Sequence, residues 1–311
     1  MKWFFNSKDE FFNVVSHPFY DLKLIVSFLV RLLGYRKKIL YITHNEIYIK
    51  NKLNEYSVNF ENLIFSTPLS SFDSKINFDL VIFDDISGIS VIEDSFVLPF
   101  LRSISSNKKI ILSMSELLTN NKIYEINDEL VLFKEPRSIQ TKIDLNYDMP
   151  HVVFEFLEWF MLNETKVILI TKDSDSSKNV YSYMKKYVSF SSKLNNVFID
   201  NNFKSFCDFE SNVKLNSYIY ITSICFFNEF QEFIFKDKSK VHNFNIVVFF
   251  ASDRVFNYKN LLSLCGMSNF LKDCKNEVIF VSNYENMEIL TAKRISRSYN
   301  KRLWEFGLRK Y

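Results

Sequence analysis

Two adjacent carboxylates, Asp84 and Asp85, follow an apolar run from Leu80 to Phe83. A strand that ends in an acidic pair is the setting in which one carboxylate binds magnesium and its neighbour orients the water that attacks a phosphate. Acidic pairs in this position also serve as helix caps or as solvated loop residues. The pair therefore predicts either a nucleotide-hydrolysis site or a structural turn, and the rest of the chain must decide between them.

The phosphate-binding half of such a site is missing. A phosphate loop needs glycines that let backbone N–H groups approach the phosphates, followed by a lysine and a serine or threonine. The chain contains four glycines, and none lies in the segment 15–21 that precedes the first long predicted helix. In that segment Pro18 removes a backbone donor, Tyr20 would fill the phosphate position and Asp21 would repel a nucleotide. We therefore expect no ATP turnover and no bound cofactor.

Other site classes find little support. The four cysteines and four histidines are scattered without a CxxC pair, which predicts free thiols and no metal site. The net charge of +3 is too small to indicate nucleic-acid binding by itself. No apolar run reaches the roughly 18 residues of a membrane span, and the N-terminal residues lack a signal-peptide cleavage site. These features predict a cytoplasmic protein.

The last predicted helix carries a basic and aromatic strip. Its cations are Lys293, Arg294, Arg297, Lys301, Arg302, Arg309 and Lys310, and its aromatic residues are Tyr299, Trp304 and Tyr311. Such a strip can neutralise phosphates and stack on bases, which predicts DNA binding through Lys293, Arg294, Arg297 and Lys301. The alternative is a solvated helix face whose apolar side, formed by Ile289, Ile295 and Trp304, packs on the domain.

Length and hydrophobic periodicity predict two α/β domains. A chain of 311 residues is long enough for two cores, and its 47% hydrophobic and 24% charged residues are typical of a globular protein. Apolar runs that alternate with helical segments indicate mainly parallel sheets covered on both faces. The polar stretch that ends at Pro150 is the predicted linker, which gives domains 1–148 and 149–311.

The predicted elements alternate in both halves. In the first half, strands are expected over 39–43, 62–66, 79–84, 109–113 and 129–133, and helices over 21–33, 46–56 and 91–103. In the second half, strands are expected over 166–171, 196–200, 217–222, 245–250 and 277–282, and helices over 151–162, 176–187, 203–213, 258–264 and 285–303.

The order of the motifs resembles that of superfamily 2 helicases. The segment 63–68 precedes the acidic pair, and the segment 109–115 follows it at a spacing of one helix. The stretches 247–256, 261–266 and 277–280 resemble the second helicase domain of ComFA, the DNA-uptake helicase of competent bacteria, to which PriA is more distantly related. The resemblance covers most of 12–303. It implies two tandem RecA-like domains, with Ser66 and Thr67 contacting DNA.

The departures from this family fall on its chemistry. Gly266 keeps one glycine of the Gly-Arg-x-Gly-Arg motif, and neither arginine is present. Aromatic residues replace the charges of the Thr-Thr-x-x-Glu-Arg-Gly motif in 222–228, and the family's zinc region is absent. Tyr20, Asp21 and Lys23 form what is left of the phosphate-binding segment. The resemblance thus implies a catalytically inactive DNA- or partner-binding module, and its candidate partners are single-stranded DNA and competence or DNA-processing proteins.

Two alternatives remain open. The first is an active but divergent ATP-dependent DNA translocase, in which Asp84 binds magnesium, Asp85 orients the attacking water and Lys23 replaces the phosphate-loop lysine. ATP and magnesium are expected as cofactors only in this case. The second is an unrelated two-domain α/β transferase with its ligand between the halves. A strand order unlike that of RecA-type domains would favour it.

Overall fold

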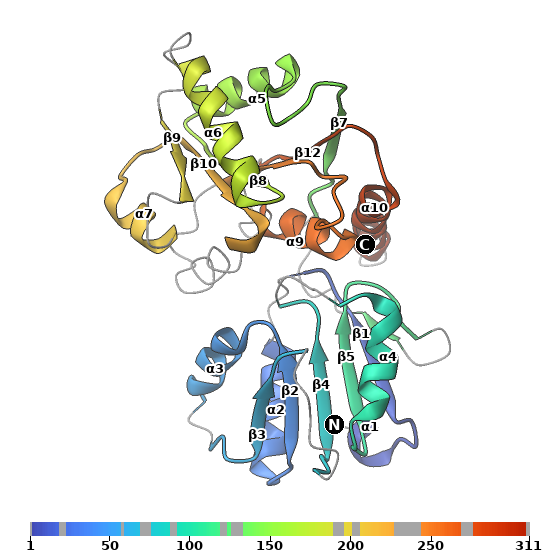
Figure 1. Ribbon diagram of the computed structural model, residues 1–311. Coiled ribbons are helices and arrows are strands. Elements are labelled where there is room, and N and C mark those ends of the chain that lie inside the picture. Colours follow the sequence, from blue (N-terminus) through green and yellow to red (C-terminus); the bar gives the residue numbers. More distant parts are fainter. Residues whose placement is uncertain are drawn as a thin grey trace. The chain divides into compact units, whose positions relative to one another are not determined.

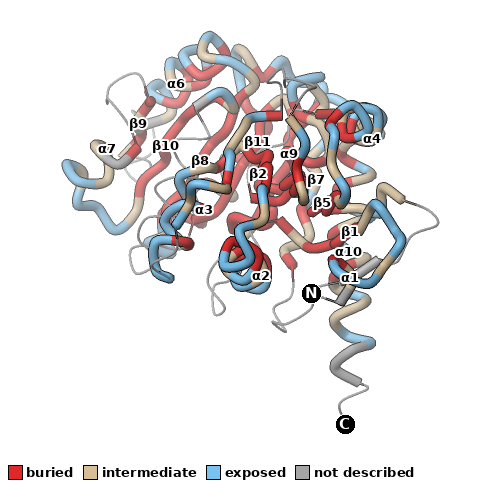
Figure 2. Tube along the Cα trace, turned by 90° about the horizontal axis from the view of Figure 1, so that it is seen from below, coloured by how far each residue is buried: buried red, intermediate tan, exposed pale blue. Residues whose placement is uncertain are grey.

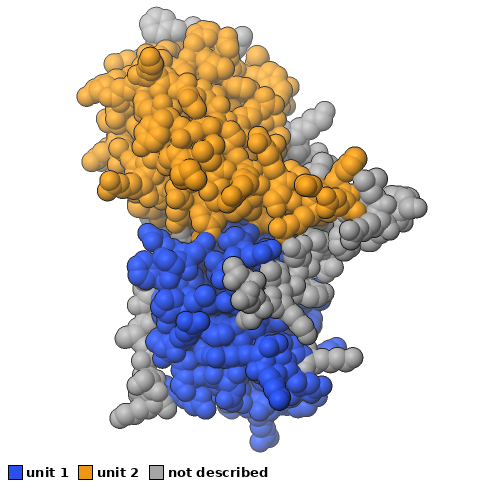
Figure 3. All heavy atoms as spheres, turned by 90° about the vertical axis from the view of Figure 1, so that its right-hand side faces the viewer, with its two compact units in different colours: residues 1–129 blue, residues 130–311 orange. Residues whose placement is uncertain are grey.

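The computed structural model describes residues 2–18, 23–56, 59–68, 76–87, 92–118, 123–125, 133–188, 196–200, 206–226, 244–268 and 276–308. The chain divides into two compact units, residues 1–129 and 130–311 (Figure 3). Each unit contains a six-stranded sheet in which all the strand pairings between named strands are parallel. This arrangement confirms the predicted α/β fold class.

The sheet of the first unit has the order β3-β2-β4-β5-β1-β6 (Figure 1). Its strands are β1 Phe11–Val15, β2 Ile39–Thr43, β3 Leu63–Ser66, β4 Leu80–Asp84, β5 Lys109–Ser113 and β6 Ile123–Glu125. The helices are α1 Lys2–Asn6, α2 Lys23–Gly34, α3 Glu46–Asn54 and α4 Asp94–Ser103.

Burial explains why the central strands of this unit are continuously apolar. Every residue of β2, β4 and β5 is buried, so both faces of the sheet need apolar side chains. Val97 and Leu101 of α4 pack on one face of the sheet. In α2, the buried residues recur at the spacing of one helix side, including Val26, Leu29 and Leu32. Figure 2 shows the strands as a buried layer between helices that expose their outer sides.

The sheet of the second unit has the order β7-β12-β11-β8-β10-β9 (Figure 1). Its strands are β7 Arg137–Gln140, β8 Lys166–Thr171, β9 Val197–Ile199, β10 Tyr218–Ser223, β11 Phe244–Phe249 and β12 Val278–Ser282. The helices are α5 His151–Leu162, α6 Ser174–Val188, α7 Phe206–Asn212, α9 Tyr258–Ser268 and α10 Met287–Leu308, and a short 3-10 helix, η3, spans Ile224–Phe226.

One core cluster joins helices to each of the four central strands of this unit. Leu157 and Phe160 of α5, together with Val180 and Met184 of α6, pack against alternate residues of β8, β10, β11 and β12. The intervening residues of these strands are also buried. Helix α9, which contacts β11, β12 and α10, is buried at every position after Tyr258. The second sheet is therefore also covered on both faces.

Three parts of the sequence-based description differ from the structure. Strand β1 was not predicted, because a five-residue segment with Asn13 in its centre gives a weak periodic signal. Strands β6 and β7 were not predicted either, and most of the strand expected over 129–133 lies outside the described residues. The division after residue 129 falls earlier than the linker expected near Pro150, because β7 pairs with β12 and Met149 belongs to the core of the second unit.

None of the described helices is both long enough and apolar enough to cross a bilayer.

Candidate functional site

The carboxyl ends of four parallel strands lie together at one edge of the first sheet. Thr43 at the end of β2 is in register with Asp84 at the end of β4, and Val15 at the end of β1 is in register with Ser113 at the end of β5. From β2 the chain continues to the neighbouring strand β3 on one side, and from β4 it continues to β5 on the other. Such a change of direction places a crevice at the carboxyl ends of the strands, where ligands of open α/β sheets bind.

Asp84 lies in this edge, and protein donors occupy its carboxylate. Oδ1 accepts hydrogen bonds from the backbone N–H groups of Ile86, at 3.1 Å, and Ser87, at 3.0 Å. Oδ2 accepts a hydrogen bond from the Tyr41 hydroxyl, at 2.9 Å, and another from the Ser87 hydroxyl. A carboxylate offers about four acceptor positions. Asp84 thus uses its capacity to close the turn after β4 and to tie it to β2.

Burial and hydrogen bonding act in opposite directions on the pKa of Asp84. Loss of solvent around the buried carboxyl group raises its pKa above the ordinary value. The hydrogen bonds from Ser87, Ile86 and Tyr41 favour the charged form and offset part of this effect, but the net direction is upward.

The loop after β2 is joined to the same turn. The backbone N–H of Asn45 donates to the Thr43 hydroxyl at 3.0 Å, and the Asn45 side-chain amide donates to the Ser87 carbonyl at 3.3 Å. Asp85 is buried, and its backbone N–H donates to the Leu112 carbonyl of β5 at 3.0 Å. These contacts form a closed polar network between β2, β4 and β5.

The segment predicted to replace the phosphate loop is described only in part. Tyr20 and Asp21 lie outside the described residues, and Lys23 is described only as the first residue of α2. Before them, the backbone N–H of Ser16 donates to the Ser113 carbonyl at 3.0 Å, which extends the pairing of β1 with β5. The structure thus places the start of this segment at the carboxyl edge.

Ser66 and Thr67, the predicted DNA contacts of the first unit, also lie at this edge. Ser66 is the last residue of β3 and is in register with Ile42 of β2. The Ser66 hydroxyl donates to the Thr67 carbonyl at 3.3 Å, and Thr67 is exposed. Thr67 is thus the more accessible of the two for a ligand.

Gly266 lies inside a buried helix of the second unit. It belongs to α9, and its neighbour Cys265 is also buried, which raises the pKa of the Cys265 thiol. The last residues of the segment matched to the arginine motif, 269–270, lie outside the described part of the chain. Inside α9 the backbone N–H of Gly266 belongs to the hydrogen bonding of the helix and is not free to approach a phosphate.

Hydroxyl groups gather at the carboxyl edge of the second sheet, where the sequence indicated no site. The hydroxyls of Thr171 and Ser177 lie 2.7 Å apart, and Thr222 donates to Asp200 at 3.0 Å. All four residues are buried. Their contacts connect the ends of β8 and β10 with the start of α6 and the residue that follows β9.

The predicted DNA-binding helix uses two of its cations within its own unit. Lys293 donates to Glu285 at 2.7 Å, and Arg297 is hydrogen-bonded to Glu135. The bond from Lys293 is the largest cause of the lowered pKa of Glu285. Arg294 is exposed, and exposed Lys301 lies 3.9 Å from Glu305. Of the four predicted contacts, Arg294 and Lys301 are the more available to a ligand.

The aromatic residues of α10 differ from both sequence interpretations. Tyr299 is buried against Phe133, with ring centroids 5.3 Å apart, so it offers no stacking surface. Trp304 is exposed, so the expectation of the solvated-helix interpretation that it packs on the domain is wrong, whereas its exposure agrees with the basic and aromatic strip. Ile289 is buried and Ile295 is half-buried, as that interpretation expected.

Asn300 has a role that the sequence did not indicate. Its side-chain amide donates to the Phe133 carbonyl at 2.8 Å, and its carbonyl oxygen accepts the Phe133 N–H at 2.7 Å. One side chain thus satisfies both backbone groups of a residue 167 positions away. Together with the Arg297–Glu135 contact, it holds the segment before β7 against α10.

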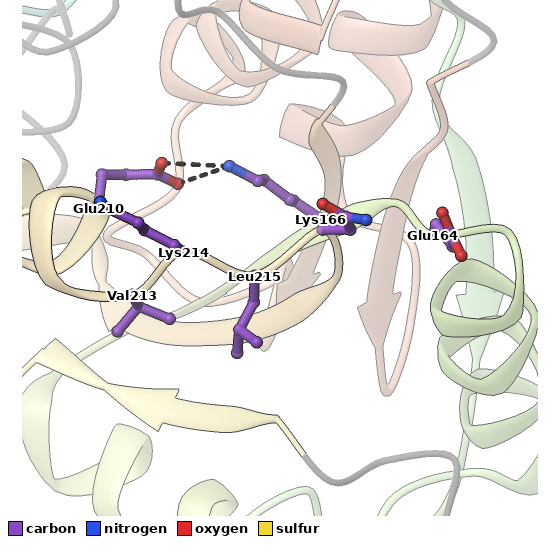
Figure 4. A pocket seen from close by; sticks show the side chains of 7 residues that line it. Glu164, Lys166, Glu210, Val213, Lys214 and Leu215 are labelled. Atoms are coloured by element: carbon purple, nitrogen blue, oxygen red, sulfur yellow. Dashed lines mark hydrogen bonds and ion pairs between the residues drawn. The ribbon is translucent and has the colours of Figure 1, made fainter.

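A polar pocket of about 480 Å³ lies at the opposite, amino-terminal edge of the second sheet (Figure 4). Its wall includes Lys166 of β8, whose amine lies 3.0 and 3.1 Å from the two carboxylate oxygens of Glu210. Tyr218 also donates to Glu210, and the Lys166 amine lies 5.0 Å from the centre of the Tyr218 ring. The charges of Lys166 and Glu210 therefore satisfy each other.

Comparison with solved structures supports the helicase-like architecture. The DEAH/RHA helicase HrpB of Escherichia coli matches with a TM-score of 0.50 and 11% sequence identity, over 92% of this chain and 41% of the helicase chain. This chain thus spans less than half of that helicase. The likeness shows the fold: two parallel α/β sheets that resemble the tandem RecA-like domains of a superfamily 2 helicase.

Sequence comparison gives no further relative. No protein-family model matches the chain, and no curated protein matches it in sequence. The likeness concerns the fold alone, and a fold does not determine a function.

Proposed function

We propose that this chain is a helicase-like protein that does not hydrolyse ATP and works as a DNA- or partner-binding module in DNA uptake or processing. The observation that carries this proposal is the state of Asp84, whose carboxylate accepts four hydrogen bonds from the protein. A magnesium ion would have to displace these donors, because it binds carboxylate oxygens directly at about 2.0–2.1 Å. The same carboxylate instead stabilises the turn after β4.

The sequence around the nucleotide position supports the same conclusion. The segment 15–21 has no glycine, and the segment matched to the arginine motif contains no arginine. Loss of an arginine that stabilises the transferred phosphate costs about 10³–10⁵ in rate. Loss of the phosphate loop also removes much of the affinity for the nucleotide. Together these changes remove the phosphate loop and the arginines that hold and activate a triphosphate in such helicases.

The test of this proposal measures phosphate release from magnesium ATP in the presence of single-stranded DNA. We expect no turnover above that of Asp84→Ala, and no heat of binding in calorimetry at millimolar nucleotide. Asp175→Ala is the matched control, because it removes an exposed carboxylate of α6. Turnover that Asp84→Ala abolishes and Asp175→Ala preserves would contradict the proposal and support the divergent translocase, with Asp84 on magnesium and Lys23 on the phosphates.

The DNA-binding part of the proposal rests on the exposed cations of α10. Arg294 is exposed, and the charge of Lys301 is only weakly compensated by Glu305. We expect Arg294→Glu and Lys301→Glu to weaken binding of single-stranded DNA in fluorescence anisotropy and to lower the slope of log affinity against log salt. Lys142→Glu, an exposed position outside α10, is the control.

The outcome separates the two kinds of module. Loss of affinity in both α10 variants and not in Lys142→Glu supports a DNA interface on this helix. Equal affinity in all three variants would place the function on a protein partner instead.

A further inference from the structure

Helix α5 of the second unit carries apolar side chains on two of its sides. One side, which includes Leu157 and Phe160, belongs to the core. On another side lie Val152, Trp159 and Leu162, all exposed, and half-buried Phe156. The spacing of these four residues, at intervals of three and four, places them in one stripe along the helix. Trp159 is 51% exposed and Leu162 is 60% exposed, although both are large and apolar.

The stripe borders a hollow. A pocket of about 480 Å³ is lined by Val152, Phe156 and Trp159 of α5, with Arg137 of β7 and Glu277 completing its wall. The Arg137 guanidinium lies 5.9 Å from the centre of the Phe156 ring, and its Nε donates to Glu277 at 3.0 Å. The protruding Trp159 and the hollow beside it thus belong to the same surface.

Strand β7 lies at the edge of its sheet, next to this surface. Among the described strands it pairs with β12 alone, so its other side offers backbone N–H and C=O groups. An edge strand beside an exposed apolar helix is a common arrangement for association between chains.

The charges of the rim are of both signs. Arg137 of β7 is 59% exposed, and Glu155 of α5 is 62% exposed. A two-fold contact brings residue i of one copy against residue j of the other and, equally, j against i. A surface that carries both an arginine and a carboxylate, and both a protruding tryptophan and a hollow, therefore holds the two halves of each complementary pair. An unrelated partner would have to supply all four complements independently.

We propose that the surface formed by α5 and the free edge of β7 binds the same surface of a second copy of this chain around a two-fold axis. The apolar stripes of the two α5 helices pack together at the centre, and Arg137 of each copy pairs with Glu155 of the other at the rim. This contact does not depend on the proposed function, because its residues are remote in sequence from Asp84 and from the cations of α10.

Sedimentation velocity over the micromolar concentration range tests the proposal. We expect the wild-type chain to dimerise and Trp159→Glu to weaken dimerisation by about tenfold or more, because a charge would enter an apolar contact. Leu162→Glu, at the end of α5, is a second variant with the same expectation. Phe96→Glu is the matched control, since Phe96 of α4 is 63% exposed and lies in the first unit.

A charge exchange tests the two-fold geometry itself. Arg137→Glu and Glu155→Arg should each weaken the dimer, and the double variant should regain most of the lost affinity. Circular dichroism checks that each variant is folded. A chain that stays monomeric at the highest concentration overturns the proposal. So does a dimer that resists both Trp159→Glu and Leu162→Glu, or one that Phe96→Glu weakens equally.

Discussion

The ion pair between Lys166 and Glu210 gives the sharpest prediction on stability. Their side chains are 7% and 10% exposed, and the Lys166 amine contacts both oxygens of Glu210. Lys166→Met would leave the carboxylate buried, with Tyr218 as its remaining donor in this group. Breaking a buried pair in this way costs about 3–5 kcal/mol of unfolding free energy.

Removing both charges should cost far less than removing one. In Lys166→Met with Glu210→Leu, no buried charge is left without a partner, and such replacements are often neutral or stabilising by about 1–4 kcal/mol. Lys301→Met is the control, because Lys301 and Glu305 form an exposed pair 3.9 Å apart, worth at most about 1 kcal/mol. The contrast between the single and double variants is therefore the quantity to measure.

The assay is urea denaturation followed by circular dichroism, with separate transitions fitted for the two units. A cost of Lys166→Met no larger than that of Lys301→Met would refute the reasoning, and so would a double variant as unstable as the single one. Burial lowers the pKa of Lys166, and Glu210 only partly opposes this effect. Because the pKa of Lys166 is lower in the folded state than in the unfolded state, protonated Lys166 destabilises the fold at pH values below 10.5. The free energy of unfolding of the wild type should therefore rise relative to that of the double variant as the pH approaches 10.5.

Three further predictions concern other contacts. Asn300→Ala should lower the free energy of unfolding by about 1–3 kcal/mol, because both backbone groups of Phe133 lose their partner; an unchanged urea midpoint would exclude this role. The pKa of Asp84 is raised in the folded state, so the wild type should gain stability relative to Asp84→Asn as the pH falls toward 3.8, and a constant difference would contradict the buried carboxyl group. The hydrogen bond to Asp148, together with burial, raises the pKa of Tyr187 to about 12. Ultraviolet titration should therefore show one tyrosine that ionises near that pH in the wild type and is missing in Tyr187→Phe. A wild type without this transition would show that the bond does not form.

Most elements of the fold were predictable from local pattern. The strands over 39–43, 109–113 and 166–171 and the helix over 151–162 occur with the bounds that periodicity indicated. Strands β1, β6 and β7 were not predictable in this way, because each is short and its pairing partner lies far away in the sequence. Such strands form because a strand from a distant part of the sequence is in place to pair with them.

The candidate site, too, has features that follow from the sequence and features that do not. The acidic pair at 84–85 and its place at the end of a strand follow from the sequence, since an apolar run must end where charged residues begin. The four hydrogen bonds on Asp84 do not follow from it, because the Tyr41 donor comes from another strand. The resemblance to helicases singles out Asp84 in the sequence. The structure shows that its carboxylate accepts hydrogen bonds from the protein itself.

The basic helix illustrates the limit of composition. From the sequence, Lys293 and Arg297 were predicted to be among the cations that face DNA. Their carboxylate partners, Glu285 and Glu135, could not be identified from the sequence. Trp304, which was assigned to the aromatic strip in one interpretation and to the packed side in the other, is exposed, whereas Tyr299 was expected to stack on bases and is buried. Helical spacing assigns residues to sides of a helix, and only the neighbouring elements determine which side is covered.

The sequence by itself determined two α/β halves with mainly parallel sheets, a segment 15–21 without glycine and a segment 266–270 without arginine, because these properties depend on residue type and local order. The tertiary structure alone decided which polar groups meet. Tyr41 and Asp84, Lys166 and Glu210, and Phe133 and Asn300 are distant in sequence, and the folded chain brings them within hydrogen-bonding distance. The physical reason is that buried polar groups must find partners, and in these three pairs the partner comes from another element of the fold.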